Sequence, residues 1–152
     1  MNNNPSGAIH PTVFIVLWGA TSFGLYYFWP LKLPELNFIE ILGGIVIVFA
    51  SLLMVWAQIV FWKHGTTVDH SKPTTTLITN GPFRFSRNPI YLALILIFTG
   101  FSIVSKNIWG IIFVIPFVLA LLRFTIQPEE NYLERKFESD YLNYRNSVRR
   151  WI

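Results

Sequence analysis

The chain has 152 residues, of which 53% are hydrophobic and only 13% are charged, with a formal net charge of +4. A soluble domain carries nearer a quarter charged residues, so this composition is typical of an integral membrane protein. The length predicts a single domain over residues 1–152. The absence of cysteine excludes disulfides, thiolate metal sites and a cysteine nucleophile.

The first half contains two apolar segments, at about residues 11–29 and 38–62. Each is long enough for a transmembrane helix, which needs roughly 20 residues. No Lys or Arg precedes the first segment, so we expect it to stay in the mature protein rather than act as a signal peptide. In the second segment, Gly43 and Gly44 predict a close approach to a neighbouring helix.

The second half predicts two further spans, at about residues 89–104 and 108–126. The link at 105–107 is very short, so these spans form a helical hairpin, and Pro116 predicts a kink in it. Residues 127–130 then read QPEE, which is typical of a new helix start, and a second short helix is expected after Ser139. The predicted fold is therefore an all-α integral membrane protein. It has four transmembrane helices, the last two a short hairpin, plus a polar loop and C-terminal amphipathic helices.

Basic residues predict which side of the membrane each connection faces. The loop at 63–88 holds four Lys or Arg and the segment after 126 holds five more, whereas the other two connections hold one each. By the positive-inside rule the loop and both termini are cytoplasmic. The membrane is the inner membrane if the protein is bacterial and the endoplasmic reticulum if it is eukaryotic. The loop and the basic C-terminal segment therefore meet on one side, where such a segment lies on lipid headgroups.

A candidate anion site lies in residues 79–91, which read TNGPFRFSRNPIY. Asn88 is a favourable helix N-cap and Pro89 a favourable first helical residue, so a helix N-terminus is expected here. Such an end attracts anions, and Arg84 and Arg87 lie beside it. The alternative is that both arginines only anchor the chain at the membrane surface.

Three further charged residues lie where the last span leaves the membrane. Glu129 and Glu130 either compensate a helix dipole or bind a cation or hydroxyl groups, and ionisable residues at this depth are functional candidates. The long Arg123 side chain has three possible roles. It places its guanidinium at the membrane–water interface, pairs with one of these glutamates, or holds an anionic group bidentately.

Other chemistries have little support in the sequence. His64, Asp69 and His70 do not have the spacing of a standard metal site, so no metal is expected. Motifs for nucleoside triphosphates, dinucleotides and serine hydrolases do not occur. The basic balance favours membrane lipids over nucleic acid as partners, and we expect packing roles for Tyr132, Tyr141 and Tyr144.

Residues 79–91 resemble the T-x-G-P-Y/F-R-x-x-R-H-P-x-Y signature of integral membrane methyltransferases, namely the isoprenylcysteine carboxyl methyltransferases and related phospholipid methyltransferases. Residues 129–144 resemble the E-E-x-x-L-x-x-x-F-G-x-x-Y-x-x-Y ending of the same families. The two motifs occur in the expected order, separated by a helical hairpin. The resemblance covers about residues 63–152. Asn88 stands where these families usually have His, and Glu138 where they usually have Gly.

The resemblance implies an S-adenosylmethionine site formed by residues 63–152. In these families the cofactor is bound at positions that match Asn88, Pro89, Tyr91 and Glu129, and a late arginine of the last span, nearest to Arg123, contacts the substrate. Asn88 removes any imidazole acid–base role but keeps a capping side chain. The residues expected at the cofactor are Thr79, Gly81, Arg84, Arg87, Asn88, Pro89, Tyr91, Glu129 and Glu130, and those expected in the reaction are Arg87 and Arg123.

The implied function is methylation of a lipophilic acceptor that enters from the bilayer. The acceptor is a prenylcysteine-type carboxylate or, alternatively, a phospholipid amine. A carboxylate needs no base, whereas an amine must lose a proton and the sequence offers no clear base for it. A different class of function, non-catalytic lipid binding on the same scaffold, also fits the sequence.

Overall fold

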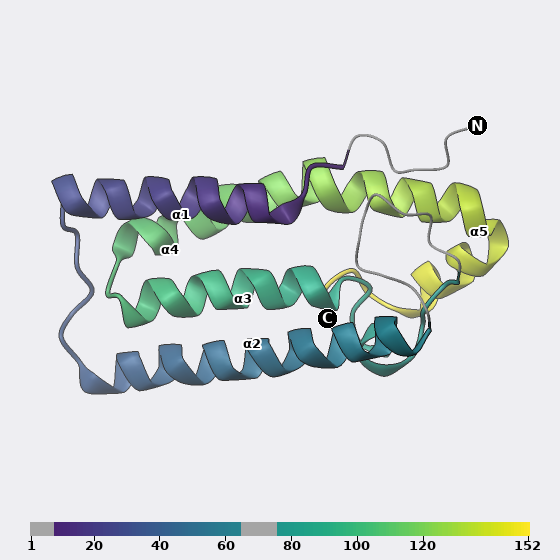
Figure 1. The fold of residues 1–152 in the computed structure, drawn as a ribbon, viewed down its shortest axis with the longest axis horizontal. Helices are drawn as coiled ribbons and strands as arrows, with labels where there is room; N and C mark the ends of the chain where they lie inside the picture. Colours follow the sequence, from purple (N-terminus) through teal and green to yellow (C-terminus); the bar gives the residue numbers. More distant parts are fainter. Residues whose placement is uncertain (1–7, 65–75) are drawn as a thin grey trace.

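The computed structural model describes residues 8–64 and 76–152. These residues are mainly helical, and their only β-type pairing is an isolated bridge between Lys32 and Asn107. In Figure 1, α1 to α4 run lengthwise beside one another and α5 turns at one end. The elements in chain order are α1 (Pro11–Phe28), α2 (Asn37–Lys63), the 3-10 turn η1 (Gly81–Arg84), α3 (Pro89–Val104), α4 (Ile108–Leu121), the π-turn η2 (Leu122–Ile126) and α5 (Gln127–Ser147).

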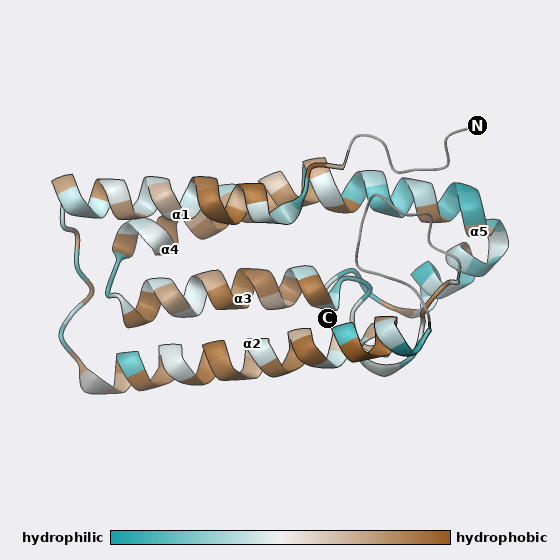
Figure 2. Ribbon diagram, in the orientation of Figure 1, coloured by the Kyte–Doolittle hydropathy of each residue, from teal (hydrophilic) through white to brown (hydrophobic). Residues whose placement is uncertain are grey.

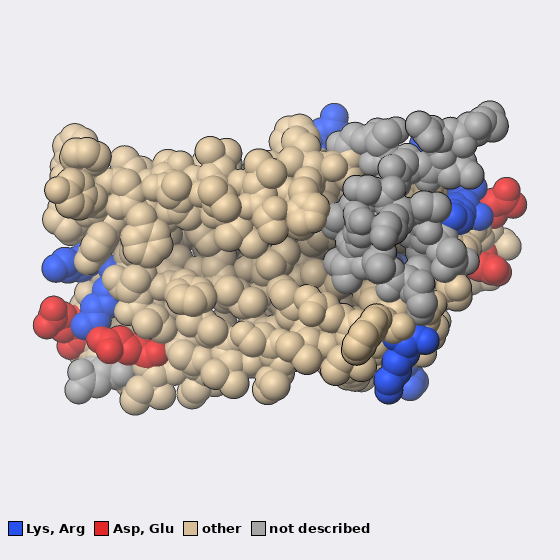
Figure 3. Space-filling model, in the orientation of Figure 1, with Lys and Arg blue, Asp and Glu red and all other residues tan. Residues whose placement is uncertain are grey.

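Three of the helical stretches are long and apolar enough to cross a membrane: Pro11–Phe28, Phe38–Lys63 and the continuous stretch Ile108–Ser147. Figure 2 shows hydrophobic residues along α1 to α4 and hydrophilic ones in α5, and on the face in Figure 3 most charges lie toward the two ends. With 16 residues, α3 is shorter and about 24 Å long, against a hydrocarbon core of about 30 Å. Its crossing, and hence the count of four spans, stays a prediction.

The crossing of α2 and α3 depends on two glycines. A Cβ on Gly43 would lie 3.1 Å from the Gly100 carbonyl oxygen, and one on Gly100 would lie 3.0 Å from the Gly43 carbonyl oxygen. The close approach predicted for Gly43 is therefore confirmed, because neither position has room for a side chain. Gly44 does not take part, since nothing lies within 4 Å of a Cβ built there.

The expected helix start at residue 127 is wrong in one respect, because helical backbone continues from α4 through η2 into α5. Pro128 has no N–H and leaves the Phe124 carbonyl without its α-helical donor. The Ile9 N–H donates to that carbonyl instead (2.9 Å), and the Thr125 hydroxyl donates to the Ile9 carbonyl (2.8 Å). Contacts with the segment before α1 thus allow Pro128 to lie inside a continuous helix.

The π-turn η2 and a kink in α5 determine where the polar side chains of α5 point. In η2 the Gln127 N–H donates to the Leu122 carbonyl, five residues back. Such a turn contains an extra residue, which rotates later side chains by about 100° around the axis. At Glu138 the backbone has φ 43° and ψ −115°, which divides α5 into two helices. The second short helix predicted after Ser139 is therefore present.

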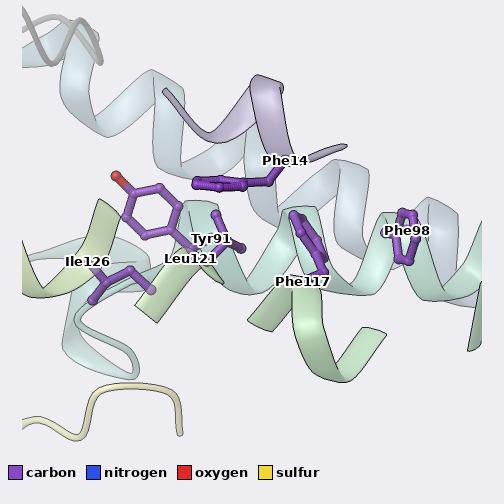
Figure 4. Close-up of a cluster of buried hydrophobic side chains, with 6 residues drawn as sticks. All are labelled: Phe14, Tyr91, Phe98, Phe117, Leu121 and Ile126. Carbon is purple, nitrogen blue, oxygen red and sulfur yellow. The ribbon is translucent and has the colours of Figure 1, made fainter. Parts of the chain in front are cut away.

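Two hydrophobic clusters hold the helices together. The first, drawn in Figure 4, joins α1, α3, α4 and η2 through Phe14, Tyr91, Phe98, Phe117, Leu121 and Ile126. The second joins the end of α2 to the segment before α3 and the second half of α5, through Ala57, Val60, Ile78, Phe83, Tyr141 and Tyr144. The second cluster lies at the polar end of the bundle, next to the candidate site.

Candidate functional site

The segment before α3 is held by a tight turn against α2. Gly81 has φ +60°, and a Cβ there would lie 2.8 Å from Val60 Cγ2, so both conformation and space favour glycine. The η1 turn, which begins at Gly81, buries Phe83. The Tyr144 hydroxyl donates to the Phe83 carbonyl at 2.7 Å. This bond fixes the segment to α5, so the two polar parts of the chain meet at one end, as predicted.

Arg87 is the central cation of the site. Its side chain is only 9% exposed, and its Nη1 lies 3.5 Å from both Glu130 Oε1 and the Tyr141 hydroxyl. Its Nε is buried and has no hydrogen-bond partner among the described residues. Buried donors are normally satisfied, so an unpaired guanidinium N–H beside two long contacts is typical of a site prepared for an anionic ligand.

Asn88 precedes α3, as predicted, but its side chain does not cap the helix. Its Nδ2 instead donates to the Arg150 carbonyl at 3.4 Å, and its backbone N–H donates to Ser86 Oγ at 3.1 Å. The capping expectation is therefore wrong, because the side-chain amide is directed to the carbonyl of a distant segment and its oxygen accepts no N–H of the first helical turn. The buried Asn88 side chain joins the start of α3 to the end of the chain.

Glu129 and Glu130 have different partners. The Tyr91 hydroxyl donates to Glu129 Oε2 at 2.6 Å, a short bond that links the first turns of α3 and α5. Figure 4 shows the Tyr91 ring within the hydrophobic cluster and its hydroxyl pointing away from it. Glu130 accepts two hydrogen bonds from Arg150, at 3.1 and 2.7 Å.

A pocket joins these groups. Its free volume is about 70 Å³, and it combines polar side chains with an aromatic and aliphatic wall. Burial, reinforced by the charge of Glu130, raises the pKa of Tyr141 to about 12, and burial also raises the pKa of Tyr144. Both phenols are therefore neutral at physiological pH and remain donors. The lining residues are Phe61, Thr76, Leu77, Ile78, Phe83, Arg87, Asn88, Glu129, Glu130, Leu133, Tyr141 and Tyr144.

Comparison with protein families gives a match to the phospholipid methyltransferases over residues 38–140. The chain belongs to the phospholipid methyltransferase family. The match contains α2, α3, α4, the first half of α5 and most of the pocket wall. A member of this family with several apolar helices is a membrane protein, and the family implies methyltransferase activity in general.

A relative from Haemophilus influenzae is 40% identical over 63 residues, which are 41% of this chain and all of the relative. It is described as an uncharacterized protein, so it adds no substrate. No solved structure matches the chain.

Only some of the residues that the sequence predicts at the cofactor or in the reaction lie together in the structure. Arg87, Asn88, Glu129 and Glu130 line the pocket, and Tyr91 reaches it through Glu129. Pro89 is buried at the start of α3 and Gly81 is partly buried beneath α2.

The other predicted residues lie outside the pocket wall. Thr79 and Arg84 are exposed, and Arg123 is exposed on the π-turn, where its Nη1 contacts Gln127 Oε1 at 3.5 Å. Asp69 and His70, together with part of the loop predicted at 63–88, fall within residues 65–75, outside the described residues.

Sequence reasoning missed several pocket residues. Tyr141 and Tyr144 were expected to pack, and they do, but both also line the pocket. Their spacing of three residues puts them on one helix face, which was an available signal. Arg150 was expected only as a basic residue of the C-terminal segment, and nothing local in the sequence indicated that it pairs with Glu130.

Proposed function

We propose that this protein is an S-adenosylmethionine-dependent methyltransferase that acts on a lipophilic acceptor within the membrane. The observation that carries the proposal is the buried Arg87 guanidinium, whose Nε lacks a partner among the described residues. Buried in a pocket at the polar end of a bundle of apolar helices, it suits the carboxylate of a small amphiphilic cofactor. S-adenosylmethionine supplies a methyl group bound to a positively charged sulfur.

The other lining residues fit the remaining parts of that cofactor. Glu129, held by Tyr91, offers a carboxylate for ribose hydroxyls or for an ammonium group. Phe61, Phe83 and Leu133 form an apolar wall suited to a flat heterocycle. The Arg87 guanidinium, the Glu129 carboxylate and the apolar wall therefore match the amino-acid, sugar and base parts of the cofactor.

Entry of a whole nucleoside requires the pocket to widen. Its free volume of about 70 Å³ is below the roughly 300 Å³ at the lower end of small-molecule sites. We expect side chains of the apolar wall to move outward on binding, since Arg87, Asn88 and Glu130 are held by bonds to other segments. Positioning in a water-poor pocket is then the main contribution of the protein to the reaction.

A second cavity supports the proposal of a lipophilic acceptor. This cavity, of about 230 Å³, lies between α1 and α3 and begins at Leu94, one helical turn from Tyr91. Its wall is mainly apolar, with Ile15, Phe23, Leu94, Ile97, Phe98 and Phe101 among its residues. A lipid tail bound there would hold its head near the polar pocket. A role for Arg123 in holding that head stays a prediction.

The chemistry of the acceptor head has two candidates. The family description favours a phospholipid amine. The described part of the polar pocket wall contains neither His nor Lys to accept a proton, which favours a carboxylate of the prenylcysteine type. Incubating the protein with radiolabelled cofactor and a panel of both acceptor kinds decides between them.

The test of the proposal is cofactor binding by purified protein in detergent, measured by titration calorimetry. We expect Arg87→Ala and Glu129→Ala each to weaken binding by about tenfold or more, because each removes a charge-assisted hydrogen bond. Arg135→Ala in α5 is the matched control, since its side chain is exposed and does not line the pocket. Arg84→Ala should weaken binding less than Arg87→Ala. Absence of binding to the wild type would refute the methyltransferase proposal and favour non-catalytic lipid binding.

A further inference from the structure

The end of the chain returns to the site as a strap, defined as residues 148–152. In Figure 1 it runs back from α5 to the beginning of α3. The Arg149 carbonyl accepts from the Arg87 N–H at 3.0 Å, and the Arg150 carbonyl accepts from Ser86 Oγ at 3.1 Å. Trp151 packs against the first hydrophobic cluster. The strap thus fixes the backbone on either side of Arg87 and is part of the site.

The Arg150 side chain makes the shorter of the two ion pairs to Glu130. Its Nε and Nη2 donate to the two oxygens of Glu130 at 3.1 and 2.7 Å, a fork geometry that only arginine provides. Glu130 is 11% exposed at its side chain, so its charge needs a partner. The Arg87 guanidinium lies farther away, at 3.5 Å.

We infer that Arg150 is a positioning residue: by neutralising Glu130, it leaves the buried guanidinium of Arg87 available for the carboxylate of the cofactor. This inference rests on the proposed function. If Arg150 is removed, Arg87 becomes the nearest cation to a buried carboxylate. Their existing 3.5 Å ion pair then shortens, and the Arg87 donors are no longer available to a ligand. In this arrangement Glu130 holds the strap through its ion pair with Arg150. Glu129 is the carboxylate that faces the cofactor.

The test compares two ligands by titration calorimetry of the full chain in detergent. S-adenosylmethionine carries the aminocarboxylate, whereas 5′-methylthioadenosine shares the nucleoside and lacks that group. We expect Arg150→Ala to weaken the first ligand by about tenfold or more and to change the second by less than about twofold. Arg135→Ala, at an exposed arginine of α5 outside the pocket wall, should change neither.

Rescue by a second substitution separates positioning from folding. In the double variant Glu130→Gln/Arg150→Ala, the carboxylate that captures Arg87 is gone, so S-adenosylmethionine binding should return to within about threefold of the wild type. Arg150→Lys should also retain most of the affinity, because an ammonium still neutralises Glu130.

Each alternative outcome has a distinct meaning. Equal weakening of both ligands by Arg150→Ala, without rescue by Glu130→Gln, would show that the strap only stabilises the fold and would overturn the inference. An unchanged affinity for S-adenosylmethionine in Arg150→Ala would overturn it as well. If the wild type binds neither ligand, the proposed function fails and the inference fails with it.

Discussion

Glu138 allows a direct test of the kink in α5 by two substitutions. Its φ of 43° and ψ of −115° lie outside the regions open to residues with a Cβ, whereas glycine enters them readily. The side chain is exposed. We therefore predict that Glu138→Gly stabilises the protein and that Glu138→Ala does not. Both changes remove the same carboxylate, so the difference between them reports the backbone alone.

The expected magnitude follows from the conformation. A non-glycine residue in such a region costs about 1–3 kcal/mol, and the greater freedom of glycine in the unfolded chain returns about 0.4–1 kcal/mol of that. The glycine variant should therefore be more stable than the alanine variant by about 1–2 kcal/mol. At Asp140, an exposed position with ordinary helical backbone, glycine should be less stable than alanine by about 1 kcal/mol.

The assay is thermal unfolding of the four variants in detergent, followed by circular dichroism. For a chain of this length, 1 kcal/mol corresponds to about 2–4 °C in Tm. The prediction is an inversion of sign, with glycine above alanine at 138 and below it at 140. The same order at both positions would mean that α5 continues through residue 138 as a regular helix, and the reasoning would be refuted.

Three further predictions concern packing, pH and the site. Gly100→Ala should destabilise the protein by about 1–3 kcal/mol, because its Cβ would lie 2.7 Å from Ile47 Cγ1 and 3.0 Å from a backbone oxygen. Gly44→Ala is the control and should not destabilise the protein, because nothing lies within 4 Å of a Cβ built there. Thermal unfolding in detergent measures both. Because the pKa of Tyr141 is raised to about 12, against about 10 in the unfolded chain, its contribution is intact below pH 10 and is lost as pH rises toward 12. Tyr141→Phe should therefore flatten the fall of Tm between pH 10 and 12, and Tyr27→Phe, at an 82% exposed residue, should not. Tyr91→Phe keeps the ring in the core but removes the 2.6 Å hydrogen bond to Glu129. Cofactor affinity, measured by calorimetry, should therefore fall about tenfold, while Tm stays within about 3 °C of the wild type. An unchanged affinity would place Glu129 outside the site.

Helix positions could be predicted from the sequence because their signals are local. The expected spans at 11–29, 38–62 and 89–104 differ by at most one residue at each end from α1, α2 and α3. Blocks of apolar residues set the lengths, and Pro11 and Pro89 mark two of the starts. The approach of another helix at Gly43 was predictable for the same reason, although its partner Gly100 was not.

The features that escaped prediction depend on contacts between distant parts of the chain. The QPEE sequence at 127–130 has the local pattern of a helix start, yet the Ile9 N–H takes the carbonyl that Pro128 leaves without a donor. Asn88 has the local pattern of a cap, yet its amide donates to Arg150, 62 residues away. A local sequence pattern indicates which hydrogen bonds a residue can form, and the tertiary contacts determine which of them it does form.

The two adjacent glutamates show how this distinction bears on function. Consecutive residues of an α-helix point about 100° apart, so Glu129 and Glu130 do not face the same group. Glu129 bonds to Tyr91 of α3, and Glu130 bonds to Arg150 of the strap. The two residues of the motif therefore differ in role. The Tyr91 hydroxyl, a neutral donor, orients Glu129, and the Arg150 guanidinium neutralises Glu130. In the proposed function Glu129 is the carboxylate that binds the ligand, whereas a Glu130 without Arg150 would draw Arg87 closer. The proposed function uses both contacts, and the π-turn before the two glutamates rotates the side chains that follow it.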